Sequence, residues 1–158
     1  MPRRNAPSPN RTLEDYAQEK LPTNLEQSIR VAKDLLSDTD DFIVRRFQVF
    51  GRTPAALFYF SDLSNQLVVN QNILQPLMQG PRHLVGEEIE PGRLKKVISD
   101  EALIHGECVL SNELYFILDA VLQGRAVVVV DGLDEAFVIG SPNVPKRSVA
   151  QPPTEQTI

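Results

Sequence analysis

The most regular hydrophobic stretch of the chain is a run of consecutive valines at residues 127–130. Side chains branched at Cβ favour the extended backbone of a strand, and apolar residues on both faces indicate a strand inside a sheet rather than at its edge. Residues 131–134 follow with the sequence Asp-Gly-Leu-Asp, in which Gly132 supplies the backbone freedom of a tight turn. Because residues 136–139 are apolar again, we predict a β-hairpin around which the rest of the chain is organised.

Helical periodicity marks three further segments. Apolar residues recur at spacings of three and four within residues 24–36, 62–74 and 112–123, and this spacing gives a helix one apolar face. Asn24 is the predicted N-cap of the first helix, because its side chain can accept a hydrogen bond from an unpaired amide of the first turn. Pro76 lies close to the end of the second helix, so we expect it to bend or end that helix.

Two strands are predicted between the first and second helices. Residues 42–50 and 55–60 are rich in β-branched and aromatic side chains, and the short connection between them favours antiparallel pairing. Within the first strand, Arg45 and Arg46 are adjacent and therefore point to opposite faces. An arginine on a face that packs under helices needs a carboxylate, and the nearby residues 38–41 offer three.

The two ends of the chain carry few apolar side chains. Proline, asparagine and arginine are frequent in residues 1–22, which we expect to be a flexible N-terminal segment, although residues 12–20 have the capping residues of a short helix. Residues 23–150 form the predicted single lobe, in which residues 146–149 are a candidate edge strand. Residues 151–158 are expected to begin a linker to a second lobe.

The order of these elements predicts an α/β fold with a small mixed, mainly antiparallel sheet packed with helices. The helix at residues 112–123 leads directly into the valine strand, as in a crossover connection, so one parallel pair of strands is compatible with the sequence. A chain of 158 residues is long enough to form one domain with a core of its own.

Charge and composition narrow the class of partner. The net charge of -5 at pH 7 argues against nucleic acid. No apolar run reaches the ~18 residues of a membrane span. A single cysteine, Cys108, excludes an internal disulfide, and its surroundings are more typical of a small core residue than of a nucleophile.

The residues that carry most catalytic and metal chemistry are sparse. His83 and His105 are the only histidines, and they lie too far apart for the usual spacing of zinc ligands. The sequence has no glycine-rich phosphate loop. We therefore predict no cofactor, no metal site and no enzymatic activity, although a thiol catalyst built from His105 and Cys108 is a weaker alternative.

Four charged residues are candidate contacts for a partner or ligand. Asp131 and Asp134 lie in the predicted turn, where they either bond back to backbone amides or, together with Glu135, hold a cation. Arg45 and Arg46 either form a solvated strand face or meet an acidic partner or the surface of an anionic membrane. This pattern indicates a binding or regulatory domain.

Five blocks of sequence, taken in order, resemble a known family. They are residues 41–47, 56–62, 69–78, 127–136 and 147–155. The first three resemble successive blocks of the GerA-type spore germinant receptor A subunit. The fourth is similar to the valine-rich strand and Asp-Gly turn of that family, and the fifth to the segment that follows them there. The ordered recurrence of all five is specific to this family.

The resemblance implies the N-terminal hydrophilic region of a receptor on the cytoplasmic side of the spore inner membrane. In that family the region precedes a bundle of membrane helices and works with B and C subunits. The receptor triggers germination in response to small nutrients such as amino acids or sugars. Because the family pattern continues beyond Ile158, we expect this chain to be the first of two soluble lobes, without the second lobe and the membrane region.

Two functions are compatible with this resemblance. In the first, the lobe is an interaction and signal-relay module, which the lack of a clustered polar and aromatic pocket in the sequence favours. In the second, it is a small-molecule germinant-binding lobe that forms a cleft with the second lobe. The resemblance implies no catalytic residues. Arg147, in the fifth block, joins the two arginines and two aspartates named above as a candidate contact.

Overall fold

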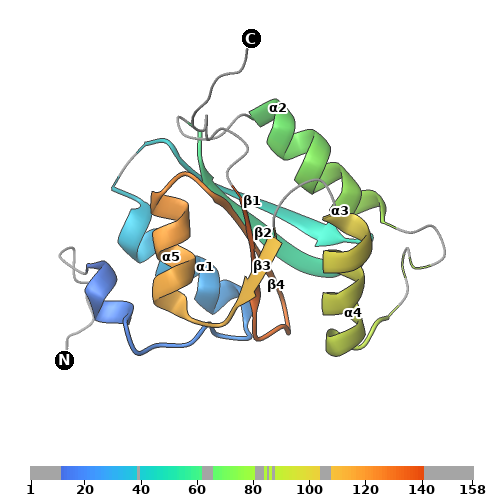
Figure 1. The fold of residues 1–158 in the computed structure, drawn as a ribbon, viewed down its shortest axis with the longest axis horizontal. Helices are drawn as coiled ribbons and strands as arrows, with labels where there is room; N and C mark the ends of the chain where they lie inside the picture. Colours follow the sequence, from blue (N-terminus) through green and yellow to red (C-terminus); the bar gives the residue numbers. More distant parts are fainter. Residues whose placement is uncertain are drawn as a thin grey trace, which may run out of the picture.

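The structure is a computed structural model, and it describes residues 12–38, 40–61, 66–80, 84, 86, 88–103 and 108–140. A five-stranded sheet lies between two groups of helices (Figure 1). The strands are β1 (Phe42–Val49), β2 (Thr53–Phe60), β3 (Cys108–Ser111), β4 (Ala126–Val130) and β5 (Ala136–Ile139). The α-helices are α1 (Leu25–Leu36), α2 (Gln66–Val69), α3 (Gln75–Gln79), α4 (Pro91–Val97) and α5 (Leu114–Leu122). The described residues also form a 3-10 helix, η2 (Leu13–Tyr16), and two π-helical segments, η3 (Asn70–Leu74) and η5 (Ile98–Ala102).

The described strands pair in the order β1-β2-β4-β5-β3, and every pair is antiparallel. The valine strand β4 is therefore the central strand. Its predicted hairpin with β5 is confirmed, with Ala126 opposite Ile139, and so is the predicted hairpin of β1 with β2. The predicted α/β class with a mainly antiparallel sheet is confirmed.

The crossover through α5 has an outcome that the sequence did not indicate. β3 and β4 run in the same direction, as a crossover connection requires, but β5 lies between them. The short turn after β4 returns β5 to the position that a parallel neighbour would have occupied. No parallel pair is therefore present among the described strands.

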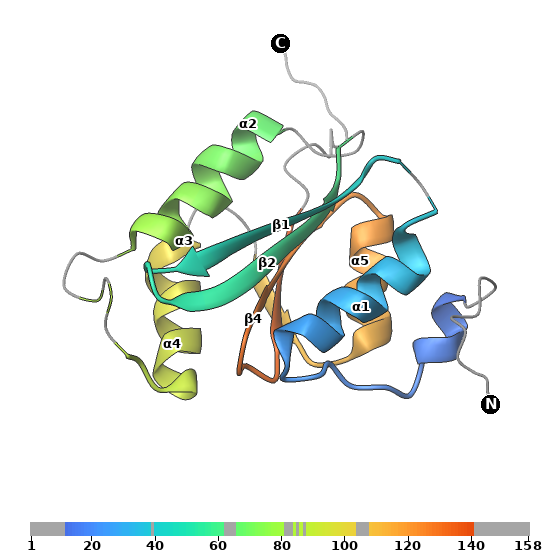
Figure 2. The ribbon, with the colours of Figure 1, turned by 180° about the vertical axis from the view of Figure 1, so that it is seen from behind.

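Helices cover both faces of the sheet. α2, η3, α3, α4 and η5 lie on one face, and η2, α1 and α5 lie on the other, as the opposite views of Figures 1 and 2 show. Alternate residues of β4 serve the two cores: Val128 packs on the α3–α4 side and Val129 on the α1–α5 side, and each is at most 1% exposed. Both faces of β4 are apolar because both are buried.

α1 has the cap and the apolar face that its sequence predicts. The side chain of Asn24 accepts a hydrogen bond from Gln27 N–H at 3.1 Å, which satisfies one of the unpaired amides of the first turn. The apolar residues that α1 buries against the sheet are Leu25, Ile29, Ala32 and Leu36.

The helix that contains Pro76 continues past it. α2, η3 and α3 follow one another without a break from Gln66 to Gln79. A proline lacks the N–H of the helical ladder, and its ring collides with the carbonyl one turn back. The wider π-helical turns of η3, immediately before Pro76, accommodate this conflict. Pro76 therefore does not end the helix, which stops at Gln79 before Gly80.

Part of the N-terminal segment packs against the domain. The segment predicted to be flexible, residues 1–22, lies outside the described residues up to residue 11. Its remainder behaves differently from that prediction: Tyr16 and Leu21 are at most 6% exposed, and Leu21 N–H donates to Asn112 O at 2.8 Å. These two side chains are part of the α1–α5 core, so the segment from Leu13 to Leu21 is anchored to the domain by apolar contacts. The predicted edge strand at residues 146–149 and the linker at residues 151–158 lie outside the described residues.

Candidate functional site at the β4–β5 turn and on β1

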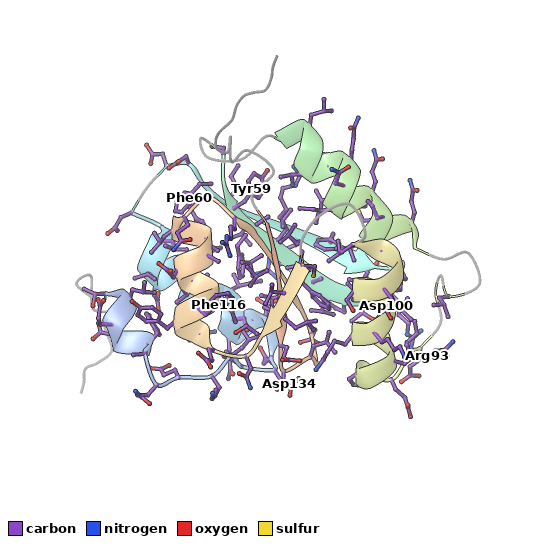
Figure 3. The ribbon with its side chains drawn as sticks, in the orientation of Figure 1. Tyr59, Phe60, Arg93, Asp100, Phe116 and Asp134 are labelled. Carbon is purple, nitrogen blue, oxygen red and sulfur yellow. The ribbon has the colours of Figure 1, made fainter. Side chains whose placement is uncertain are left out.

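The β4–β5 turn lies at one end of the sheet, where Asp134 is labelled in Figure 3. Its backbone reverses through Gly132, whose φ is 89°, and Leu133 N–H donates to Val130 O at 3.1 Å. The side chain of Leu133 is buried in the α3–α4 core. This buried leucine fixes the turn and so positions the acidic residues on either side of it.

Asp131 connects the turn to α1. Its carboxylate oxygen Oδ1 accepts a hydrogen bond from the backbone N–H of Leu25, the first residue of α1, at 2.9 Å. The next residue, Gly132, donates its N–H to Thr23 O at 2.8 Å. Because the first amides of a helix have no partner within the helix, the carboxylate of Asp131 acts as a second cap supplied from a distant part of the chain.

Asp134 and Glu135 connect the same turn to α4, on the other face of the sheet. Lys95 of α4 donates from Nζ to Asp134 Oδ1 at 3.0 Å and to Glu135 Oε1 at 2.8 Å. Hydrogen bonds to Glu135 and Asp134 raise the pKa of Lys95, and the hydrogen bond from Lys95 lowers the pKa of Asp134. Lys95 and Asp134 are therefore both charged at neutral pH.

We call Asp131, Gly132, Asp134 and Glu135 the interlayer turn, because they join helices on opposite faces of the sheet. Its acids do not converge on one point, since Asp131 is directed to α1 and the other two to Lys95. Within the described residues, no group of three or more histidine, cysteine, aspartate or glutamate side chains is arranged to hold a metal ion. The alternative of a cation held by these acids therefore has no geometric support.

Arg46 lies on the α1–α5 face of β1 and pairs with Glu26 of α1. Its Nη1 lies 2.6 Å from Glu26 Oε2 and its Nη2 lies 2.9 Å from Glu26 Oε1, a two-point contact between planar groups. The mutual hydrogen bonds lower the pKa of Glu26 and raise that of Arg46. The prediction that residues 38–41 supply the carboxylate is wrong for Arg46. The first turn of α1 lies on the same face of the sheet as Arg46, so Glu26 is within reach of its guanidinium.

Arg45 lies on the opposite face, beside the partly buried Ile43 and Phe47 of the α3–α4 core. Its side chain is exposed. No ion pair or hydrogen bond of the Arg45 side chain occurs within the described part of the chain. Of the two adjacent arginines, Arg45 is thus the one whose charge is available to a partner.

The remaining candidates are placed as follows. Arg147, His83 and His105 lie outside the described residues. Cys108 is half-buried at the start of the edge strand β3 and packs against the α3–α4 core, and burial raises the pKa of its thiol. A raised thiol pKa keeps the side chain protonated at neutral pH and makes it a poor nucleophile.

Two residues that contact the candidate site, Lys95 and Glu26, were not identified from the sequence. Lys95 belongs to a helix with several basic residues and the turn is acidic, so their charges are complementary. However, Lys95 and Asp134 are 39 positions apart, and complementary charge alone does not pair one lysine with one aspartate over that separation.

Comparisons with known proteins gave a family match and a similar solved structure. A model of the Bacillus/Clostridium GerA spore germination protein family matches residues 15–158. Among solved structures, the chain is similar to the N-terminal domain of the A subunit of the Bacillus megaterium spore germinant receptor GerK3, with a TM-score of 0.63 and 18% sequence identity. This likeness covers 77% of the present chain and 47% of the solved one, so the chain spans about half the length of its solved neighbour. No curated protein matches the sequence.

At 18% identity, the likeness to the solved domain shows a shared fold. A separate observation concerns membranes: among the helices in the described ranges, none has the length and apolar character needed to cross a bilayer.

Proposed function

The chain belongs to the Bacillus/Clostridium GerA spore germination family, and on that premise we propose that it is an interaction and signal-relay lobe of a germinant receptor A subunit. In this role it passes a change of state between the membrane part of the receptor and its B and C subunits. The lobe works on the cytoplasmic side of the spore inner membrane, and it catalyses no reaction and needs no cofactor.

The interlayer turn is the observation that supports this role. The turn is bonded to α1 through Asp131 and to α4 through Asp134 and Glu135. A displacement of α4 moves Lys95, and Lys95 pulls on residues that lie three and four positions from Asp131. Small shifts of this kind become discrete rearrangements where packed elements have alternative positions. A binding event on one face of the sheet can therefore be transmitted to the other.

The exposure of these contacts suits a switch. The side chain of Asp134 is 68% exposed and that of Lys95 is 26% exposed. Ion pairs near water cost little to break, because water solvates the separated charges. The contacts of Lys95 can therefore open and close during signalling without unfolding the domain.

The experiment places Lys95→Met in the full-length receptor and measures spore germination against nutrient concentration. Methionine keeps most of the apolar stem and removes the charge. We expect the concentration for half-maximal germination to change severalfold at unchanged receptor level. Lys96→Met is the matched control, because Lys96 is the next residue of α4 and has no ion-pair partner among the described residues. An unchanged response of the Lys95→Met receptor would refute the relay role.

A germinant-binding lobe is the alternative function. The solved domain that shares this fold extends over about twice the matched length, which supports a second body with which a cleft forms. Titration of amino acids and sugars into the isolated chain separates the two functions. A relay lobe should show no saturable shifts of its amide resonances at millimolar nutrient. A localised, saturable response with a sub-millimolar Kd would instead make this lobe the sensor.

A further inference from the structure

β1 is an edge strand, and only one of its sides pairs with another strand of the described sheet. The hydrogen bond from Ser61 N–H to Asp41 O, at 2.8 Å, fixes the phase of the β1–β2 ladder. Because backbone groups alternate along an antiparallel strand, every second residue of β1 points its N–H and C=O away from β2. These outward residues are Phe42, Val44, Arg46 and Gln48.

The outward backbone groups form an open ladder. None of them takes part in a hydrogen bond within the part of the chain that the structure describes. In Figure 2, β1 lies along the near rim of the sheet, and no helix crosses it in this view. β1 is eight residues long, longer than the typical strand of ~5–6 residues. An open edge of this length is a template on which another strand can pair.

The side chains of β1 also leave apolar surface for a neighbouring strand to cover. Four of them are only partly buried against the cores: Phe42, Ile43, Val44 and Phe47. An added strand would cover these side chains from the edge on both faces. Main-chain hydrogen bonds then supply affinity, and the alternating side chains of the added strand supply specificity.

Charge indicates what kind of strand fits. The charge of Arg46 is already paired with Glu26, but Arg45 has no partner among the described residues. The residue directly opposite Arg45 on an added strand would have its Cβ about 5 Å from that of Arg45. A carboxylate at this position is within reach of the guanidinium and would pair with it.

We propose that β1 is a strand-addition site for an extended segment of a partner polypeptide that carries a carboxylate opposite Arg45. A second copy of this chain is a poorer occupant. The registers that pair most of β1 with itself are centred on Arg45 or on Arg46. The first places two unpaired Arg45 side chains opposite one another, and the second places Arg45 opposite Phe47, which offers no carboxylate. Like charges directly opposite are destabilising. The site does not depend on the relay role, because it uses β1 and not the interlayer turn.

The first experiment measures amide hydrogen exchange of the 158-residue chain with two probe peptides. Both are eight-residue peptides of alternating valine and threonine with blocked ends, and they differ only in a central glutamate or lysine. The glutamate peptide should slow exchange at the outward amides, such as those of Val44 and Arg46, and leave the intervening amides unchanged. It should bind about fivefold more tightly than the lysine peptide, the equivalent of about 1 kcal/mol.

Two variants and one control variant keep the experiment decisive. Gln48→Pro removes an outward N–H, which an edge strand tolerates, and should abolish peptide binding without lowering the unfolding temperature. Gln48→Ala is its control, because it changes the side chain and keeps the N–H, and it should bind normally. Arg45→Glu should reverse the preference, so that the lysine peptide binds more tightly.

Three results would overturn the proposal. The first is unchanged exchange of the outward amides at millimolar glutamate peptide. The second is sedimentation evidence that the chain itself dimerises with protection of those same amides, which would make a second copy the occupant. The third is binding of the chain to anionic phospholipid vesicles that Arg45→Glu abolishes, with neither peptide bound, which would assign Arg45 to a membrane surface.

Discussion

A Gly80→Ala substitution tests whether the β1–β2 turn is locked to the end of α3. Phe50, in that turn, is 1% exposed and has a φ of 53°, a region that bulky residues rarely adopt. Its N–H donates to Leu77 O at 2.7 Å. Its ring lies against Gly80, where an added Cβ would overlap the ring atom Cδ1 and lie 2.6 Å from Cε1. The lack of a side chain at residue 80 is therefore a packing requirement.

Two costs add in this variant. Gly80 has φ 61° and ψ -177°, a conformation that other residues adopt only at a cost of about 1–3 kcal/mol. The overlap forces a buried ring to move, which costs about another 1–3 kcal/mol. The free energy of unfolding should thus fall by about 2–6 kcal/mol, a large part of the ~5–15 kcal/mol that stabilises a typical domain. Gly132→Ala is the control: φ there is 89°, but no atom outside the adjoining residues lies within 4 Å of the added Cβ, so only the backbone cost of about 1–3 kcal/mol applies.

Urea unfolding followed by far-ultraviolet circular dichroism measures these differences, since the chain has no tryptophan for fluorescence. In a Phe50→Leu background the smaller side chain leaves room, so Gly80→Ala should cost less there, by a coupling energy of about 0.5–3 kcal/mol. If Gly80→Ala costs no more than Gly132→Ala, or if its cost is the same with leucine at residue 50, the proposed lock between turn and helix is refuted.

Three further expectations use the same assay. Asp131→Ala should lower the free energy of unfolding by about 1–2 kcal/mol, because it removes the distant cap of α1. Asp131→Asn should lower it less, because asparagine keeps an acceptor oxygen; equal decreases would argue against the cap. Val128→Asp should cost at least ~3 kcal/mol, because it buries an unpaired charge in the central strand; an unchanged urea midpoint would contradict that position. The bonds of Lys95 should stabilise the domain at neutral pH. Because the pKa of Asp134 is lowered, this stabilisation is lost as the pH falls below the ordinary value of 3.8. Because the pKa of Lys95 is raised, the stabilisation is also lost as the pH rises beyond 10.5. A difference in the free energy of unfolding between Lys95→Met and wild type that persists at pH 2 would contradict this expectation.

Local pattern was sufficient to predict the hairpin of β4 and β5. Four valines in a row and an Asp-Gly turn each favour the same conformation, so the elements and their pairing follow from adjacent residues. The position of β5 beside β3 required more information. Whether a crossover leaves its two strands adjacent depends on which edge the other strands occupy, and no local pattern of the sequence reports that position.

The interlayer turn shows why site residues were only partly predictable. Turn chemistry identified Asp131 and Asp134, but their partners lie far away in the chain: Asp131 bonds to an amide 106 positions earlier. Spacing patterns report on neighbours within one helix or strand. They carry no information about which helix a turn will meet, because that depends on how the helices cover the sheet. The aspartates were therefore identified, and their roles were not.

The two adjacent arginines of β1 illustrate the same limit and lead to a last expectation. Strand alternation correctly placed Arg45 and Arg46 on opposite faces. On the face shared with α1, Glu26 supplies a carboxylate to Arg46. On the other face water solvates Arg45, so folding requires no partner for it. Arg45→Gln should therefore unfold at the same urea midpoint as wild type and yet lose the charge preference of the β1 edge. A lower midpoint would show that the charge of Arg45 serves folding, and would remove the reason to assign that charge to a partner strand.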